Sequence, residues 1–128
     1  MRILLDTCAF VWLITDAPEL SVTARSVFST AENEVYLSAV SGWEIALKYS
    51  LGRLELQDAP DVYVPRERQR HGIEPLPLDE TAALHLPKLP LLHKDPFDRM
   101  LVCQALAHGL VILTPDDLVR RYPIRTVW

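Results

Sequence analysis

Short apolar runs alternate with longer amphipathic segments along this chain. Apolar runs that are too short for a helix predict strands at residues 2–5, 35–37, 73–78, 110–113 and 124–127. The run 110–113 is apolar on both faces, which is typical of a central strand covered by other layers. Pro75 and Pro77 interrupt the run 73–78, so either an edge strand or a loop is expected there.

The strongest helix signal lies between Asp95 and Gly109. Asp95 suits the N-cap, the proline after it suits the first helical position, and Asp98 then stands at the third. Gly109 occupies the place where a left-handed residue ends a helix. These signals predict a helix over residues 96–108. Residues 114–117 repeat the order of cap, proline and acid, which predicts a second acidic helix start.

Weaker capping signals predict further helices. Ser41 and Glu44 form an S-x-x-E capping box, which predicts a helix that begins at Ser41 and ends at Gly52. Pro65 predicts a break near Val64 or a first-turn position of a later helix, because a proline inside a helix removes a hydrogen bond and clashes with the preceding turn. Helices are also expected over residues 8–14, 22–31, 58–71 and 79–86.

The alternation of strands and helices predicts the fold class. It favours an α/β domain with three layers, α/β/α, and a mainly parallel central sheet. The 128 residues are enough to bury a core, and no repeat or linker interrupts them. We therefore expect residues 1–128 to form a single domain.

Composition narrows the class of protein. The chain is 49% hydrophobic and 23% charged, which is ordinary for a globular protein, and no apolar run is long enough to cross a membrane. The first residues are interrupted by acid too early for a signal peptide. Cys8 and Cys103 lie among apolar residues and are expected as buried thiols in a reducing cytoplasm.

Four acidic residues stand beside predicted strand ends or helix starts. Singly, each has a structural explanation as a turn, cap or first-turn residue. In a parallel sheet, however, the carboxyl ends of the strands meet at one edge, and four carboxylates there would repel one another without a cation. Carboxylate oxygens suit Mg²⁺ or Mn²⁺, which activates water and stabilises charge on a phosphodiester. The four candidates are Asp6, Glu44, Asp98 and Asp116.

Other candidate chemistry is weaker. The four histidines have no zinc-like spacing, and no glycine-rich phosphate loop is present. The net charge of −4 argues against holding a nucleic acid by charge alone. Arg99 is either a solvated side chain or, beside Asp98, a group that approaches a phosphate. Arg66, Arg68 and Arg70 form either a solvated helix face or a more distant basic patch.

Four blocks of the sequence together resemble PIN-domain ribonucleases, and within that family the VapC-type toxins of toxin–antitoxin pairs. The blocks are LLDTCAFVWLI, SAVSGWEIALKYSLGRL, HKDPFDRMLVCQALAHGLVILTPDD and RYPIRTVW, in the family's order over nearly the whole chain. The resemblance implies a Mg²⁺- or Mn²⁺-dependent endoribonuclease that cuts RNA. It also implies a homodimer and a small antitoxin protein that holds the toxin inactive.

The resemblance assigns the site residues one by one. Its four acids carry over as Asp6, Glu44, Asp98 and Asp116, while Thr7 and Thr114 match the hydroxyl residues beside the first and fourth acids. Cys8 departs from the pattern, because related toxins often have histidine there. Asp98 is preferred over Asp95 because it precedes the apolar helix in the register of the family's third acid. The adjacent pair Asp116 and Asp117 leaves the fourth acid open by one residue.

Two alternatives remain at this point. One is a PIN-like module that binds RNA or protein without cutting, which the presence of all four acids disfavours. The other is a metal-dependent phosphatase or a phospho-acceptor domain. The phosphatase would have D-x-D after the first strand, whereas Asp6 is followed by Thr7 and Cys8, and the phospho-acceptor domain would have an acid pair and a lysine on a late strand, which the last strands do not offer. The apolar residues from Trp43 to Leu56 belong to the core or, in part, to a groove for an antitoxin.

Overall fold

A computed structural model describes all residues 1–128, and at its centre lies a five-stranded sheet in the order β3-β2-β1-β4-β5. Every neighbouring pair of strands is parallel. The proline-containing strand is an edge strand, one of the two alternatives that the sequence left open. The strands are β1 (Arg2–Leu5), β2 (Glu34–Ser38), β3 (Glu74–Leu76), β4 (Val111–Leu113) and β5 (Thr126–Val127).

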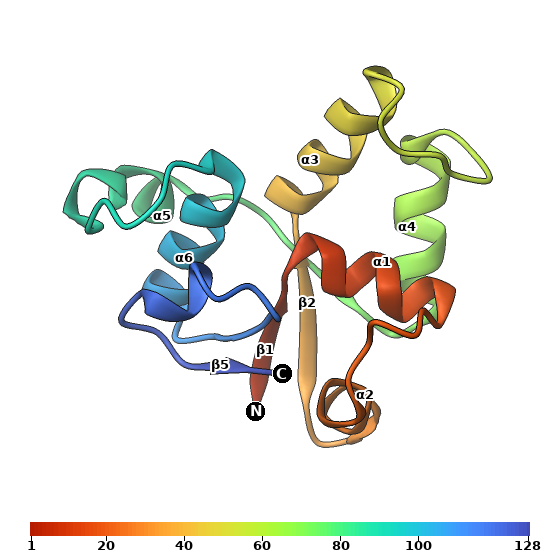
Figure 1. The fold of residues 1–128 in the computed structure, drawn as a ribbon, viewed down its shortest axis with the longest axis horizontal. Helices are drawn as coiled ribbons and strands as arrows, with labels where there is room; N and C mark the ends of the chain where they lie inside the picture. Colours follow the sequence, from red (N-terminus) through yellow and green to blue (C-terminus); the bar gives the residue numbers. More distant parts are fainter.

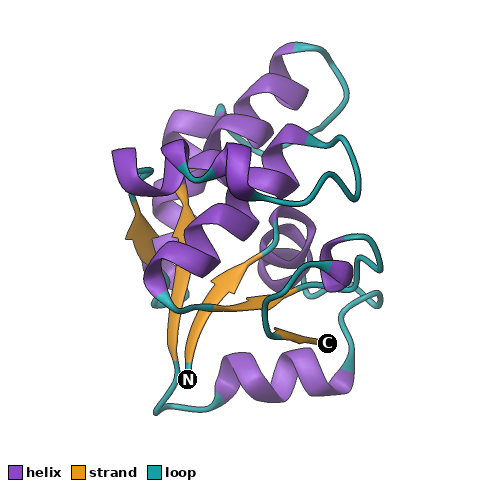
Figure 2. Cartoon of the chain, turned by 90° about the vertical axis from the view of Figure 1, so that its left-hand side faces the viewer, coloured by secondary structure: helices purple, strands orange, loops and turns teal.

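Helices cover both faces of the sheet, which confirms the predicted three-layer α/β/α class (Figures 1 and 2). Helices α1 and α2 cover one face, and α6 covers the other. None of the helices is long and apolar enough to span a bilayer. The helices are α1 (Thr7–Thr15), α2 (Val22–Ser29), α3 (Ala39–Ser50), α4 (Pro60–Arg70), α5 (Glu80–Leu84) and α6 (Pro96–His108), with 3₁₀ turns η1 (Leu86–Lys88) and η2 (Val119–Arg121).

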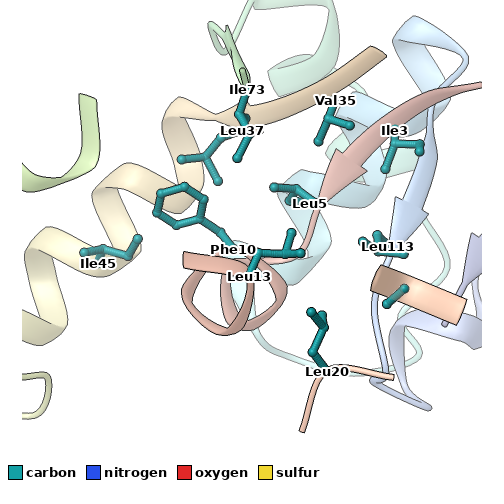
Figure 3. Close-up of a cluster of buried hydrophobic side chains, with 11 residues drawn as sticks. Ile3, Leu5, Phe10, Leu13, Leu20, Val35, Leu37, Ile45, Ile73 and Leu113 are labelled. Atoms are coloured by element: carbon teal, nitrogen blue, oxygen red, sulfur yellow. The ribbon is translucent and has the colours of Figure 1, made fainter. Parts of the chain in front are cut away.

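The two-residue period of the strands divides the core. Ile3 and Leu5 of β1 point towards α1, whose Phe10 is fully buried among them, as Figure 3 shows. Leu4 and Ile112 point to the opposite face and pack against α6. Burying each side chain of this size contributes about 1.5–3 kcal/mol. The two clusters hold the carboxyl ends of β1 and β4 in fixed places.

The ends of α6 lie where the sequence predicted them. Asp95 is the N-cap, and its Oδ1 accepts hydrogen bonds from the N–H groups of Phe97 and Asp98 at 2.9 and 3.0 Å. Gly109 follows the helix with φ +64°, a conformation that an L side chain rarely adopts. Asp98 therefore stands in the first turn of a buried helix, next to the sheet.

The predicted start of α3 was wrong. Ser38, not Ser41, is the N-cap, and its Oγ accepts a hydrogen bond from the N–H of Val40 at 2.9 Å. β2 continues to Ser38 because that residue pairs with Leu76 of β3. Glu44 consequently lies beyond the first turn and does not cap the helix.

Two other boundaries were also wrong. Helix α4 continues through Pro65, because buried Tyr63 and Glu67 anchor it and outweigh a local penalty of about 3 kcal/mol. No α-helix begins at residues 114–117, where a turn leads into the 3₁₀ turn η2. Thr114 still acts as a local cap, since its Oγ1 accepts the N–H of Asp116 at 3.0 Å.

Candidate active site

A cavity of about 340 Å³ opens at the edge where β1, β2 and β4 end. Its wall carries a single basic side chain, that of Lys48, and an apolar part that includes Val11, Trp12 and Leu54. All four acids assigned from the sequence line it. The acids on its wall are Asp6, Glu44, Asp95, Asp98 and Asp116.

Asp6 directly follows β1 and is the N-cap of α1. Its carboxylate accepts two hydrogen bonds, one from the N–H of Thr7 at 2.7 Å and one from the hydroxyl of Thr114 at 2.5 Å. The hydroxyl of Thr7 donates in turn to Ser41 of α3 at 2.9 Å, and all of these residues are buried. Both threonines therefore hold the Asp6 carboxylate in one orientation.

Glu44 reaches the cavity from α3. Its Oε2 accepts a hydrogen bond from the Nζ of Lys48, one turn later, at 2.6 Å. The Glu44 side chain is only 8% exposed, and its Oε1 is buried without a hydrogen-bond partner. A buried carboxylate oxygen without a partner is costly, so a cation or water is expected to bind there.

Asp98 reaches the cavity from the first turn of α6. Its Oδ2 lies 3.2 Å from Nε2 of His93, and its side chain is 13% exposed. The neighbouring Asp95 also lines the cavity, but its Oδ1 is engaged in capping the helix. The sequence alone did not single out His93, because the contact joins a loop residue to a helix residue without a recognised spacing.

The turn after β4 places Asp116 in the wall of the cavity and Asp117 outside it. Asp116 lines the cavity, and its Oδ1 accepts the N–H of Leu118 at 2.8 Å. Asp117 does not line it, and its side chain is 90% exposed beside Arg120. The structure thus brings Asp116 together with the other acids and leaves Asp117 outside.

Burial and the proximity of other acids shift the pKa values of the acids in the cavity. Burial, followed by repulsion from Asp6, Asp95 and Asp116, raises the pKa of Asp98 to about 7. Burial also raises the pKa of Asp6, against the lowering effect of its hydrogen bonds with the threonines. The hydrogen bond with Glu44 raises the pKa of Lys48, so this lysine stays charged.

Two side chains that attracted attention in the sequence have other roles. Burial raises the pKa of Cys8 to about 12, with a contribution from Asp6, so its thiol stays protonated and is a poor nucleophile. Arg99 is 9% exposed and does not line the cavity. Its Nη1 donates instead to the carbonyl of Pro90 at 2.9 Å and to the hydroxyl of Tyr122 at 3.0 Å.

The basic residues of α4 are also engaged elsewhere. Arg66 pairs with Asp58 at 2.7 Å, and Arg70 pairs with Glu67 at 3.3 Å. Arg68 donates to the carbonyl of Ile73 at 3.2 Å. None of the three lines the cavity, so Lys48 is the basic residue that a ligand in the cavity would meet.

The donor set suits a hard divalent cation. Every acid on the wall offers carboxylate oxygens, burial together with mutual repulsion raises the pKa values of Asp6 and Asp98, and Glu44 Oε1 has no partner. No three His, Cys, Asp or Glu side chains are gathered closely enough to bind one ion directly. Mg²⁺ commonly binds through one or two carboxylates and keeps several waters, so the residues present fit such an ion.

Solved structures share this fold. A VapBC2 complex from Rickettsia felis, bound to a DNA fragment from its promoter, aligns with a TM-score of 0.75 and 15% identity, covering 99% of this chain and 98% of that one. A DNA-bound VapBC complex from Salmonella typhimurium aligns with a TM-score of 0.68 and 23% identity, covering 99% and 97%. At these identities the likeness shows the fold.

Sequence comparison adds a relative and a family. Ribonuclease VapC16 from Mycobacterium tuberculosis is 38% identical over 61 residues, which cover 48% of this chain and 43% of the relative. The chain thus matches less than half of the length of that relative. The model of the PIN domain matches residues 3–124. Because that match spans nearly the whole chain, the protein belongs to the PIN-domain family.

Proposed function

We propose that this protein is an endoribonuclease that depends on Mg²⁺ or Mn²⁺ and acts as the toxin of a toxin–antitoxin pair, with residues 1–128 as one PIN domain. The observation that carries the proposal is the cavity at the sheet edge, where five carboxylates face a single lysine. The name of the ribonuclease from M. tuberculosis supports the same chemistry.

The acids divide into two roles. Asp6, held by Thr7 and Thr114, and Asp98, on the first turn of α6, are proposed to hold the ion. A bound Mg²⁺ or Mn²⁺ would supply activation of water and neutralisation of charge on the phosphodiester. Glu44 and Asp116 would complete the site through waters and orient the attacking water.

Lys48 and Glu44 form an ion pair in the wall of this cavity. The Lys48 side chain is 50% exposed, whereas that of Glu44 is 8% exposed, so the ammonium group reaches solvent from a buried partner. The RNA backbone carries negative charge that the acidic wall repels. Lys48 is therefore proposed to meet a backbone phosphate, a role that its position supports better than that of Arg99.

The proposal includes partners. The related structures are named as VapBC complexes, and a cognate antitoxin protein is proposed for this chain as well. Trp43 on helix α3 is 61% exposed and Leu51, the C-cap of this helix, is 56% exposed, an amount of apolar surface that supports a protein partner there. RNA is the proposed substrate, a homodimer the proposed assembly and the cytoplasm the proposed place of action.

Incubation of the purified protein with structured RNA tests the activity. We expect cleavage with Mn²⁺ and none with EDTA. Asp98→Asn should lower the cleavage rate by about 10³-fold or more, because a bound ion supplies several kcal/mol of charge stabilisation in the transition state. Asp95→Asn is the matched control and should cost far less, since asparagine also caps a helix.

Opposite results would refute the assignment. If Asp95→Asn were inactive while Asp98→Asn still cut RNA, the third acid would be Asp95. If the wild type cut RNA equally well in EDTA, the metal-dependent reaction would be wrong. Thermal unfolding of each variant shows whether a loss of activity follows from a loss of fold.

A further inference from the structure

A chain of hydrogen bonds runs from Asp98 to the segment after β4. Nε2 of His93 lies 3.2 Å from Oδ2 of Asp98, and Nδ1 of the same ring lies 2.7 Å from the hydroxyl of Tyr122. The hydroxyl also accepts a hydrogen bond from Nη1 of Arg99 at 3.0 Å. Four side chains from three parts of the sequence thus form one connected path.

The donors in this path determine the tautomer of His93. A guanidinium group can only donate, so Arg99 uses a lone pair of the Tyr122 oxygen. The single hydroxyl hydrogen of Tyr122 then has Nδ1 of His93 as its acceptor. If Nδ1 accepts, the hydrogen of the neutral ring is on Nε2, which donates it to Oδ2 of Asp98.

The path is buried and anchored at the far end. Tyr122 is 3% exposed, Arg99 is 9% exposed and the His93 side chain is 8% exposed, so water competes little with these bonds. Arg99 also donates to the carbonyls of Pro90 and His93 at 2.9 and 3.4 Å. The Tyr122 and His93 rings meet edge to face, with centroids 5.3 Å apart. The His93 ring therefore has little freedom to rotate.

We propose that His93, Tyr122 and Arg99 are positioning residues, which hold His93 as an Nε2–H donor and thereby aim the Asp98 carboxylate into the cavity. The inference rests on the proposed function of Asp98 as a metal ligand and names the residues that orient it. Oδ2 is engaged by His93, and Oδ1, which no hydrogen bond in the structure engages, is left for the cavity. Tyr122 does not line the cavity and acts on the site only through its hydrogen bond with His93.

The tautomer can be read directly in the metal-free protein. Protein labelled with ¹⁵N in its histidine rings gives distinct nitrogen shifts for protonated and unprotonated ring positions, and His93→Gln identifies the signals of His93. We expect the hydrogen on Nε2 and none on Nδ1, in spectra recorded at a pH where the ring carries one hydrogen. A hydrogen on Nδ1 under those conditions would overturn the inference whatever the enzymatic activity.

A set of variants tests the consequence for the site. Tyr122→Phe keeps the ring and removes the hydroxyl, and should lower Mn²⁺ affinity and kcat by about tenfold or more with little change in KM. Tyr63→Phe on α4 is the matched control, because Tyr63 is also buried, at 6% exposed, and lies away from the cavity. His93→Gln, which keeps an N–H donor, should retain more Mn²⁺ affinity than His93→Leu.

The outcomes separate the two proposals. Equal Mn²⁺ affinity in Tyr122→Phe and Tyr63→Phe, measured by calorimetry on folded protein, would overturn the positioning role while leaving the metal site in place. Absence of Mn²⁺ binding in the wild type would instead overturn the proposed function. The ring signals of the wild type decide the hydrogen-bond path even if a variant fails to fold.

Discussion

The protein buries carboxylates in two regions, and their surroundings are opposite. Glu67 on α4 is 4% exposed, and Arg66, Arg70 and His71 lie between 3.3 and 3.9 Å from its carboxylate. In the cavity, by contrast, five acids face one lysine. The chain therefore supplies several cationic partners to a single acid in one place and one cation to several acids in the other.

The difference separates Glu67, a structural acid, from the acids of the cavity, for which a function is proposed. A buried charge is stable when partners in the same chain compensate it, as the arginines do for Glu67. The five acids of the cavity share one lysine, and burial together with repulsion between them raises the pKa of Asp98. A site that is incomplete without an added cation is consistent with a metal-dependent enzyme, and each region predicts a different response to mutation.

The largest expected effect is stabilisation of the cavity by metal. Mn²⁺ at 100 times its dissociation constant should stabilise the folded state by about 2.7 kcal/mol. For a domain of this size, that free energy corresponds to a rise in Tm of about 10 °C. Thermal unfolding with Mn²⁺, Mg²⁺ and EDTA measures it.

The double variant Asp6→Asn with Asp98→Asn is the control for this shift. Asparagine at position 6 can still cap α1, so the fold should persist while the response to Mn²⁺ disappears. An equal Tm shift in the wild type and the double variant would place the ion elsewhere. Loss of the shift in the double variant alone would assign the ion to the cavity.

A smaller effect is expected when the other region is broken. Glu67→Gln keeps the shape of the side chain but removes the charge that the arginines compensate. Arg66 and Arg70 are 35% and 64% exposed and stay hydrated, so the loss should be about 1–2 kcal/mol, or roughly 4–8 °C in Tm. RNA cleavage and the Mn²⁺ shift should remain as in the wild type.

The comparison fails if Glu67→Gln behaves like a cavity variant. Loss of RNA cleavage in a folded Glu67→Gln protein would assign this acid to the site. Unchanged Tm would show that the charges around it contribute nothing measurable. Glu74→Gln, an exposed substitution in edge strand β3, is a suitable control and should leave Tm nearly unchanged.

Local signals predicted the fold where neighbours in sequence set the structure. Asp95 and Gly109 bound α6 because a cap and a left-handed glycine act within one turn. The start of α3 could not be read in this way, since Ser38 and Ser41 both suit an N-cap. Pairing of Ser38 with Leu76 on another strand decides between them, and no local pattern carries that information.

The candidate site divides along the same line. Its acids stood out in the sequence because they follow strands or open helices. Glu44 and Lys48 are one turn apart, and this spacing could have indicated their ion pair. The contact of His93 with Tyr122 spans 29 residues, and it depends on how η2 packs against α6. Spacing along the chain gives no sign of such a contact.

The last expected effect is a dependence of stability on pH that arises from Asp98 in the cavity. The pKa of Asp98 is about 7 in the folded protein, above the value of about 3.9 for an unfolded aspartate. Between these values the folded state binds more protons than the unfolded state. Stability from this group is therefore present at low pH and is lost as pH rises towards 7.

Comparison of the wild type with Asp98→Asn isolates this contribution from those of all other groups. Tm of metal-free wild type should fall relative to that of Asp98→Asn as pH rises from 5 to 8, by about 10 °C at most, because two pKa units correspond to about 2.7 kcal/mol. The Tm shift caused by Mn²⁺ should grow over the same range, because the ion binds the ionised carboxylate. If the two proteins kept a constant difference in Tm, Asp98 would not titrate in this window. That result would mean that groups of the folded chain already compensate the charge of Asp98, as the arginines compensate that of Glu67.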